Sequence, residues 1–135
     1  MMVPRHILIT GASSGIGAAL ARHYASAGAR LNLGGRNQQR LQEITADCRE
    51  RGAAVLPRAV DVTDRSAMRE WILGADSEAP LDLVVANAGI GANEGTGRDS
   101  ESRAREVFAV NLQGVLNTAY PAIERWQSAG AANSR

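Results

Sequence analysis

Short apolar runs alternate with longer stretches of helical periodicity along this chain, four times in succession. The apolar runs, which predict strands, occupy residues 6–10, 30–34, 55–62 and 81–86. The stretches that follow them predict helices over residues 14–27, 37–51, 64–74 and 101–126. Strands that alternate with helices in this way are typical of parallel βαβ units, with helices on both faces of the sheet. The pattern predicts an α/β fold, a three-layer doubly wound parallel sheet formed by one domain over residues 1–135.

Single positions refine this plan. The first helix carries Ile16, Leu20 and Tyr24 at helical spacing, which predicts its apolar side. Thr63 precedes the third helix and is placed to cap it. Pro57 has no N–H to donate to a strand ladder, so the third strand is predicted at an edge of the sheet.

Composition argues against several kinds of partner. A formal charge of +1 and 4% aromatic residues give no electrostatic case for a nucleic acid or a membrane surface.

The N-terminus lacks the apolar region of a signal peptide, so we expect a cytoplasmic protein. Cys48, the only cysteine, shares a helical stripe with Leu41 and Ile44, which predicts a buried thiol. His6 and His23 lack partners at ligand spacing, so no metal site is predicted.

The first strand runs into a turn that is rich in glycine, and the turn opens the first helix. Gly11 permits a tight turn, Gly15 lets the backbone approach a pyrophosphate, and Gly17 lets the helix pack closely. The free N–H groups and the positive dipole end of a helix N-terminus favour an anion. The strand, the turn and the helix start together predict a phosphate site.

Four motifs follow one another over residues 5–126. They are Thr10-Gly11-x-x-x-Gly15-x-Gly17, Asp61-Val62, Asn87-Ala88-Gly89, and Asn111 within Val110-Asn111-Leu112-Gln113-Gly114. In their order and spacing they resemble the short-chain dehydrogenase/reductase family, classical type. The resemblance implies a Rossmann-like sheet of order 3-2-1-4-5-6-7, of which this chain would form an incomplete part with the order 3-2-1-4. It also implies hydride transfer between a nicotinamide cofactor and a small carbonyl or alcohol substrate.

The resemblance also implies which residues bind the dinucleotide. The cofactor-binding positions are Gly11, Ser13, Ser14, Gly15, Ile16, Gly17, Arg36, Asp61, Val62, Asn87, Ala88 and Gly89. In the family the carboxylate at the position of Asp61 binds the adenine amino group. The alternative is a purely structural role, in which Asp61 is an acidic residue at the start of the next helix. The Asn87-Ala88-Gly89 turn is expected to brace the sheet beside the cofactor.

Arg36 carries the prediction of cofactor preference. NAD-preferring relatives have an acid at the position of Gly35, and an arginine can instead bind a 2′-phosphate with its fork of donors. NADP(H) is therefore favoured over NAD(H). The alternative is that Arg36 is a solvated arginine at the start of a helix.

Asn111 lies in an otherwise apolar part of the last predicted helix. In the family this asparagine kinks the helix and holds a water in a proton relay, so it is the one catalytic candidate here. The alternative is a capping or packing asparagine.

The family's catalytic Tyr-x-x-x-Lys pair cannot occur, because the chain contains no lysine. Tyr24 and Tyr120 precede Gly28 and Glu124 at that spacing, and residues 128–135 read as a polar tail without a domain-ending helix. The chain is therefore expected to be the N-terminal, cofactor-binding half of such an enzyme, truncated before strand five and inactive alone.

Alternatives to this interpretation are a catalytically silent dinucleotide-binding or regulatory protein and the product of a truncated reading frame. Without strand five, the fourth strand would present an open edge and the last helix would expose apolar residues, so self-association is expected.

Residues 91–100 are polar and rich in glycine, which predicts a flexible loop over the cofactor.

Overall fold

A parallel four-stranded sheet forms the centre of the computed structural model, which describes residues 3–91 and 99–133. The strands are β1 (His6–Ile9), β2 (Arg30–Gly35), β3 (Ala54–Ala59) and β4 (Leu83–Val85). They lie in the order β3-β2-β1-β4, and all neighbours are parallel. The predicted α/β class and strand order are confirmed, and Pro57 lies in the edge strand β3 as its missing N–H requires.

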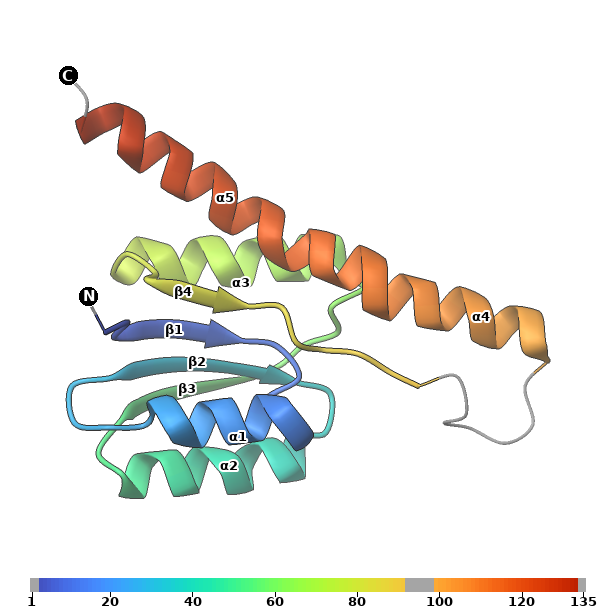
Figure 1. Ribbon diagram of the computed structural model, residues 1–135, viewed down its shortest axis with the longest axis horizontal. Helices are drawn as coiled ribbons and strands as arrows, with labels where there is room; N and C mark the ends of the chain where they lie inside the picture. Colours follow the sequence, from blue (N-terminus) through green and yellow to red (C-terminus); the bar gives the residue numbers. More distant parts are fainter. Residues whose placement is uncertain (1–2, 92–98, 134–135) are drawn as a thin grey trace.

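Helices cover both faces of this sheet (Figure 1). On one face lie α1 (Gly15–Tyr24) and α2 (Gln38–Glu50), and on the other lies α3 (Arg65–Glu78). A long helix packs against α3 and is built from α4 (Ser100–Phe108), the π-helical segment η1 (Ala109–Gln113) and α5 (Gly114–Asn133). This long helix extends past the sheet at both ends (Figure 1).

Two apolar clusters fill the space between these layers because successive strand residues point to opposite faces. Ile7 and Ile9 belong to the cluster beneath α1 and α2, whereas Leu8 belongs to the cluster beneath α3 and α5. Cys48 is fully buried in the first cluster beside Leu41, as predicted, and burial raises the pKa of its thiol.

The side of α1 that faces the sheet agrees with the prediction only in part. Ile16 is 72% exposed, whereas Gly17, Ala18 and Ala21 are buried. Small residues let the helix axis approach the sheet closely, and a large apolar residue in the first turn is left at the surface. The prediction from periodicity is therefore confirmed for Leu20 and Tyr24, which are partly buried and pack on the core, and is wrong for Ile16.

Several predicted boundaries also shift. Strand β3 ends at Ala59 because its partner β2 ends at Gly35, so residues 60–62 lie beyond the strand. Asp64, not Thr63, caps α3: its Oδ1 accepts a hydrogen bond of 3.0 Å from the N–H of Ala67. The helix then continues to Glu78, past the predicted end at residue 74.

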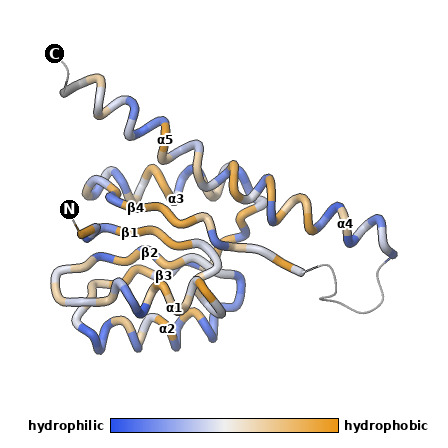
Figure 2. Tube along the Cα trace, in the orientation of Figure 1, coloured by the Kyte–Doolittle hydropathy of each residue, from blue (hydrophilic) through white to orange (hydrophobic). Residues whose placement is uncertain are grey.

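The C-terminal part of the chain is more helical than predicted. Helix α5 runs to Asn133, so the expectation of a tail without a helix over residues 128–135 is wrong as far as residue 133. Residues 128–132 hold three alanines, which favour the helical conformation. Figure 2 shows apolar positions recurring along α4 and α5 on the outside of the molecule.

Among the described residues, no helix combines the length and the apolar character that crossing a bilayer requires.

Candidate functional site at the carboxyl ends of the strands

A cleft of about 550 Å³ opens where the carboxyl ends of the strands meet the first turns of the helices. Such an edge is where open parallel sheets bind ligands, since the turns diverge there to the two faces. The cleft is lined by Gly11, Ser13, Ser14, Gly15, Ile16, Gly34, Gly35, Arg36, Asn37, Arg40, Val60, Asp61, Val62, Asn87, Ala88, Gly89, Ile90 and Val110. Segments that are distant in the sequence thus meet in one concave site.

The β1–α1 turn depends on glycine at two left-handed positions. Gly11 has φ +64° and Gly15 has φ +53°, and no other residue type in the described chain has positive φ. A Cβ at Gly15 would meet nothing within 4 Å, so its backbone is open to a ligand. Gly17 is different, because a Cβ there would lie 2.1 Å from the carbonyl oxygen of Gly11. Gly17 therefore packs α1 against the turn and does not itself line the cleft.

The N-terminus of α1 is not capped by a side chain, unlike those of three other helices. Ser14 is the N-cap residue, and its hydroxyl makes no capping hydrogen bond. The corresponding N-caps of α2, α3 and α4, namely Asn37, Asp64 and Asp99, each accept a hydrogen bond from their helix. The first turn of α1 also holds no acidic residue. Its N–H groups and its positive dipole end are therefore suited to an external anion.

Hydrogen bonds join this turn to the segment after β4. The Thr10 hydroxyl, which is buried, accepts hydrogen bonds from the N–H groups of Asn87 at 3.0 Å and Ala88 at 3.1 Å. The Asn87 side chain donates back to the carbonyls of Thr10 at 3.2 Å and Gly11 at 3.3 Å. The predicted brace at Asn87-Ala88-Gly89 is thus present. Its buried partner is Thr10, a residue of the first motif to which the sequence analysis gave no role.

Arg36 lies in the turn between β2 and α2, and its side chain is exposed at the cleft. Gly35 precedes it, and a Cβ at Gly35 would lie 3.2 Å from both side-chain atoms of Ser13. The β1–α1 and β2–α2 turns therefore approach each other closely here. A side chain at position 35 would need Ser13 to move.

Asp61 and Val62 form the third side of the cleft, in the turn after β3. One oxygen of Asp61 accepts hydrogen bonds from the N–H of Thr63 at 2.9 Å and from its hydroxyl at 2.8 Å. This local turn holds the carboxylate at the cleft, while Asp64 caps the helix instead. The alternative that Asp61 starts the helix is therefore wrong.

Asn111 does not line the cleft but anchors a residue that does. Its Oδ1 accepts a hydrogen bond of 2.8 Å from the N–H of Ile90, and its Nδ2 donates to the carbonyl of Ile90 at 3.0 Å. Asn111 lies in η1, where the N–H of Gly114 bonds the carbonyl of Ala109 five residues earlier. The π-helical turn marks the irregularity expected at this asparagine. Both polar atoms of the Asn111 side chain bind Ile90, so the structure shows an anchoring role for Asn111. Its role in a proton relay stays a prediction.

Other candidates lie away from the cleft. His6 is buried, with its ring nitrogens near the Ala79 carbonyl at 2.9 Å and the Asn32 amide at 2.7 Å, which agrees with a structural role. Within residues 3–91 and 99–133, no group of three or more His, Cys, Asp or Glu side chains is arranged to hold a metal. Tyr24 packs on the core beneath α1, and Tyr120 lines a separate groove between α3 and α5. The predicted loop over residues 91–100 lies outside the described residues at positions 92–98.

Sequence reasoning missed several lining residues. Gly34, Asn37, Arg40, Val60, Ile90 and Val110 all line the cleft. A signal existed for Arg40, which stands four residues after Arg36 and three after the helix-capping Asn37. Val110 belongs to the fourth motif, in which only Asn111 was given a role, and Gly34, Asn37, Val60 and Ile90 belong to none of the four motifs.

Comparison with known proteins identifies the family. A sequence model of the family described as short chain dehydrogenase matches residues 5–133 of the chain. The chain belongs to the short-chain dehydrogenase family. The resemblance drawn from the four motifs is therefore confirmed, and the protein is an oxidoreductase-family chain with a Rossmann-like fold.

Individual relatives agree with this assignment. The chain is 40% identical over 115 residues to an uncharacterized oxidoreductase of Myxococcus xanthus, a match that covers 84% of this chain and 46% of the relative. It is 32% identical over 133 residues to a 3-dehydrosphinganine reductase of Arabidopsis thaliana, covering 96% and 39%. The chain thus spans less than half the length of these curated relatives.

Solved structures match to a similar extent. An alcohol dehydrogenase from Thermococcus sibiricus, solved in complex with 5-hydroxy-NADP, superposes with a TM-score of 0.77 at 35% identity. The match covers 89% of this chain and 52% of the other. A short-chain dehydrogenase/reductase of Serratia marcescens gives a TM-score of 0.79 at 27% identity, covering 89% and 50%.

Proposed function

We propose that this chain is the dinucleotide-binding half of an NAD(P)-dependent oxidoreductase, and that it prefers NADP(H). The observation that carries the proposal is the uncapped N-terminus of α1, opened by two left-handed glycines and facing a cleft with Arg36 and Asp61 on its other sides. A relative in the same family was solved with a hydroxylated NADP, which supports a nicotinamide dinucleotide as the ligand.

Each part of the cleft fits one part of such a ligand. The N–H groups of the α1 start, with Ser13, Ser14, Gly15 and Ile16, would bind the pyrophosphate. The Asp61 carboxylate beside buried Val62 would accept from the adenine amino group, and Asn87, Ala88 and Gly89 would lie along the ribose. A bound nicotinamide dinucleotide supplies a hydride donor or acceptor to a carbonyl or alcohol.

The preference for NADP(H) rests on the β2–α2 turn. Arg36 offers a planar fork of donors that matches a phosphate, and Gly35 leaves no acid that would accept from the ribose hydroxyls. The close approach of Gly35 to Ser13 supports the same preference, since an acidic side chain at position 35 would crowd Ser13.

The chain by itself is expected not to transfer hydride. It has no lysine, and neither Tyr24 nor Tyr120 lines the cleft. A free tyrosine has a pKa of about 10, so it needs a nearby cation to exchange protons near neutrality. The fuller activity, with a carbonyl or alcohol substrate, is proposed for the longer protein that its relatives represent.

Calorimetric titration of the chain with NADPH and with NADH separately tests the proposal. Binding of both, with NADPH tighter, is the expected result. Failure to bind either dinucleotide would reject the proposed function, and equal affinities would reject the preference. Turnover of any ketone or alcohol in a panel by the purified chain would contradict the expectation that the chain alone cannot transfer hydride. Tyr120 would then be the first residue to test as the proton donor or acceptor.

A further inference from the structure

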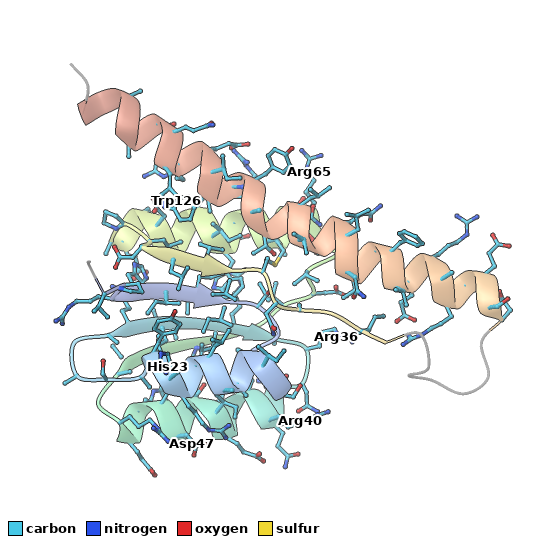
Figure 3. All side chains as sticks on the ribbon, in the orientation of Figure 1. His23, Arg36, Arg40, Asp47, Arg65 and Trp126 are labelled. Atoms are coloured by element: carbon cyan, nitrogen blue, oxygen red, sulfur yellow. The ribbon has the colours of Figure 1, made fainter. Side chains whose placement is uncertain are left out.

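The cleft contains a second arginine that belongs to none of the sequence motifs. Arg40 lies in the first turn of α2 and lines the same cleft as Arg36. The Asn37 side chain accepts a hydrogen bond of 2.9 Å from the backbone N–H of Arg40, so this turn of the helix is held in place. Figure 3 shows Arg36 and Arg40 at the end of the sheet where the β2–α2 turn lies. Both side chains are exposed.

The positive charge of this pair is not balanced within the described chain. Neither Arg36 nor Arg40 forms an ion pair among residues 3–91 and 99–133, whereas Arg22, Arg30, Arg58, Arg69, Arg103, Arg105 and Arg125 do. Asp61 is the only carboxylate among the described residues that line the cleft, and its Oδ1 accepts hydrogen bonds from Thr63. Two guanidinium groups therefore face the cleft without a carboxylate partner from the described part of the protein.

The position of Arg40 on its helix is also unusual on electrostatic grounds. The N-terminal turn of a helix carries the positive end of the macrodipole, so it favours acidic side chains and disfavours basic ones. The first turn of α2 has no acidic residue, and Arg40 adds a positive charge there. A bound anion at this point would interact favourably with Arg36, with Arg40 and with the helix dipole together.

We propose that Arg40 binds the 2′-phosphate of NADP(H) together with Arg36 and is a second residue that determines cofactor preference. A phosphate monoester carries a charge of about −1.5 to −2 at neutral pH and has three acceptor oxygens, more than one guanidinium fork satisfies. Arg36 approaches from the turn and Arg40 from the first turn of the helix, so the two forks reach different oxygens. This inference rests on the proposed function, and its test separates the two.

The test compares Arg40→Gln with Arg51→Gln in the full chain. Gln keeps the length and the helix propensity, and both changes remove one positive charge. Arg51 is exposed at the C-cap of α2, about 16 Å from Arg40 along the helix axis. Affinities for NADPH, NADH, adenosine 2′,5′-bisphosphate and adenosine 5′-monophosphate are measured by calorimetry at one low salt concentration. The two adenosine phosphates isolate the 2′-phosphate contribution from the nicotinamide end.

We expect Arg40→Gln to weaken NADPH and the bisphosphate by about tenfold and NADH and the monophosphate by less than about twofold. Arg51→Gln is expected to change none of the four affinities.

If the wild type prefers NADPH but Arg40→Gln matches Arg51→Gln, the assignment of Arg40 is wrong and the proposed function stands. An equal loss for all four ligands would also overturn it. If the unchanged chain binds neither dinucleotide, the proposed function itself fails. Thermal melts without ligand check that both variants fold as the wild type does.

Discussion

The cleft and the long helix α4–η1–α5 are both exposed, but they present opposite chemistry to the solvent. The cleft presents backbone N–H groups, arginines and a carboxylate on a wall of glycines. The long helix presents large apolar side chains, of which Phe108, Leu112, Leu116, Tyr120, Ile123 and Trp126 are each 40% exposed or more. The first surface suits a small charged ligand, and the second suits another apolar surface.

The two regions also differ in how they are held. In the cleft, buried Thr10 and the Asn87 side chain tie the β1–α1 turn to the segment after β4 by four hydrogen bonds. The long helix rests mainly on α3, with the Arg125–Asp76 pair at 2.8 Å and the bond from Trp126 to the Leu81 carbonyl at 2.9 Å. The comparison teaches that hydrogen bonds among the described residues hold the cleft together, whereas the long helix leaves an apolar stripe without cover from those residues.

The largest expected effect comes from the contact that holds the cleft together. Gly17→Ala puts a Cβ 2.1 Å from the Gly11 carbonyl oxygen and 2.6 Å from Nδ2 of Asn87, so the backbone of the turn and the Asn87 side chain would both have to shift. We expect a loss of about 3 kcal/mol in the free energy of unfolding and loss of dinucleotide binding. Urea unfolding and calorimetry measure the two effects.

Gly74→Ala is the matched control, since a Cβ on this helical glycine of α3 meets nothing within 4 Å. It is expected to stabilise the chain by about 0.5–1 kcal/mol. If Gly17→Ala unfolds like the wild type, the packing of α1 on its turn does not support the cleft.

The second effect concerns the apolar stripe. We predict that the chain self-associates through the long helix, the β4 edge, or both, and that Leu112→Glu with Leu116→Glu shifts it toward the monomer by about 2 kcal/mol. Sedimentation velocity over a concentration series measures this shift. Leu56→Glu is the control, because Leu56 is 45% exposed on the opposite edge strand β3. A wild type that stays a monodisperse monomer at tens of micromolar would contradict the prediction.

The third effect probes selectivity at the β2–α2 turn. Arg36→Asp replaces a phosphate-binding cation by a carboxylate that repels phosphate and accepts from ribose hydroxyls. We expect the preference to move toward NADH by about 2 kcal/mol, read from the ratio of the two calorimetric affinities. Arg51→Asp, which makes the same charge change at the far end of α2, is expected to leave the ratio unchanged. An unchanged ratio in Arg36→Asp would remove Arg36 from the site.

The smallest effect is a pH dependence at the start of the β1–β4 pair. The Asp82 carboxylate accepts hydrogen bonds from the N–H groups of His6 at 2.9 Å and Arg5 at 2.8 Å, and these lower its pKa below the usual 3.8. A carboxyl with a lowered pKa in the folded state stabilises the fold above its unfolded pKa and loses this contribution as pH falls below it. We expect Asp82→Asn to cost less than about 1 kcal/mol at pH 7, and the difference from wild type to shrink as the pH falls from the unfolded pKa through the lower folded pKa. Urea unfolding at several pH values measures it, and a difference that does not change with pH would assign the effect to packing.

The sequence by itself determined the order of the elements and the ligand end of the sheet. Alternating apolar runs and helical stretches are local patterns, so four strands, their helices and the glycine turn at Gly11, Gly15 and Gly17 were predicted from neighbouring residues. Arg36, Asp61 and Asn87 were placed correctly at the cleft because each follows a strand, and parallel strands end at the same edge. Proline chemistry likewise placed Pro57 in an edge strand.

Only the tertiary structure decided which side chains meet. The bonds from Asn87 and Ala88 to Thr10 join residues that are 77 and 78 positions apart, and Asn111 reaches Ile90 across 21 positions. Local periodicity carries no information on such pairs, which is why Ile16 was assigned to the apolar side and Arg40 was overlooked. Ile16 is exposed because small residues bring α1 close to the sheet, and Arg40 lines the cleft because the Asn37 cap starts α2 beside the β1–α1 turn. Both outcomes depend on how closely two elements approach each other, a distance that the packed fold sets.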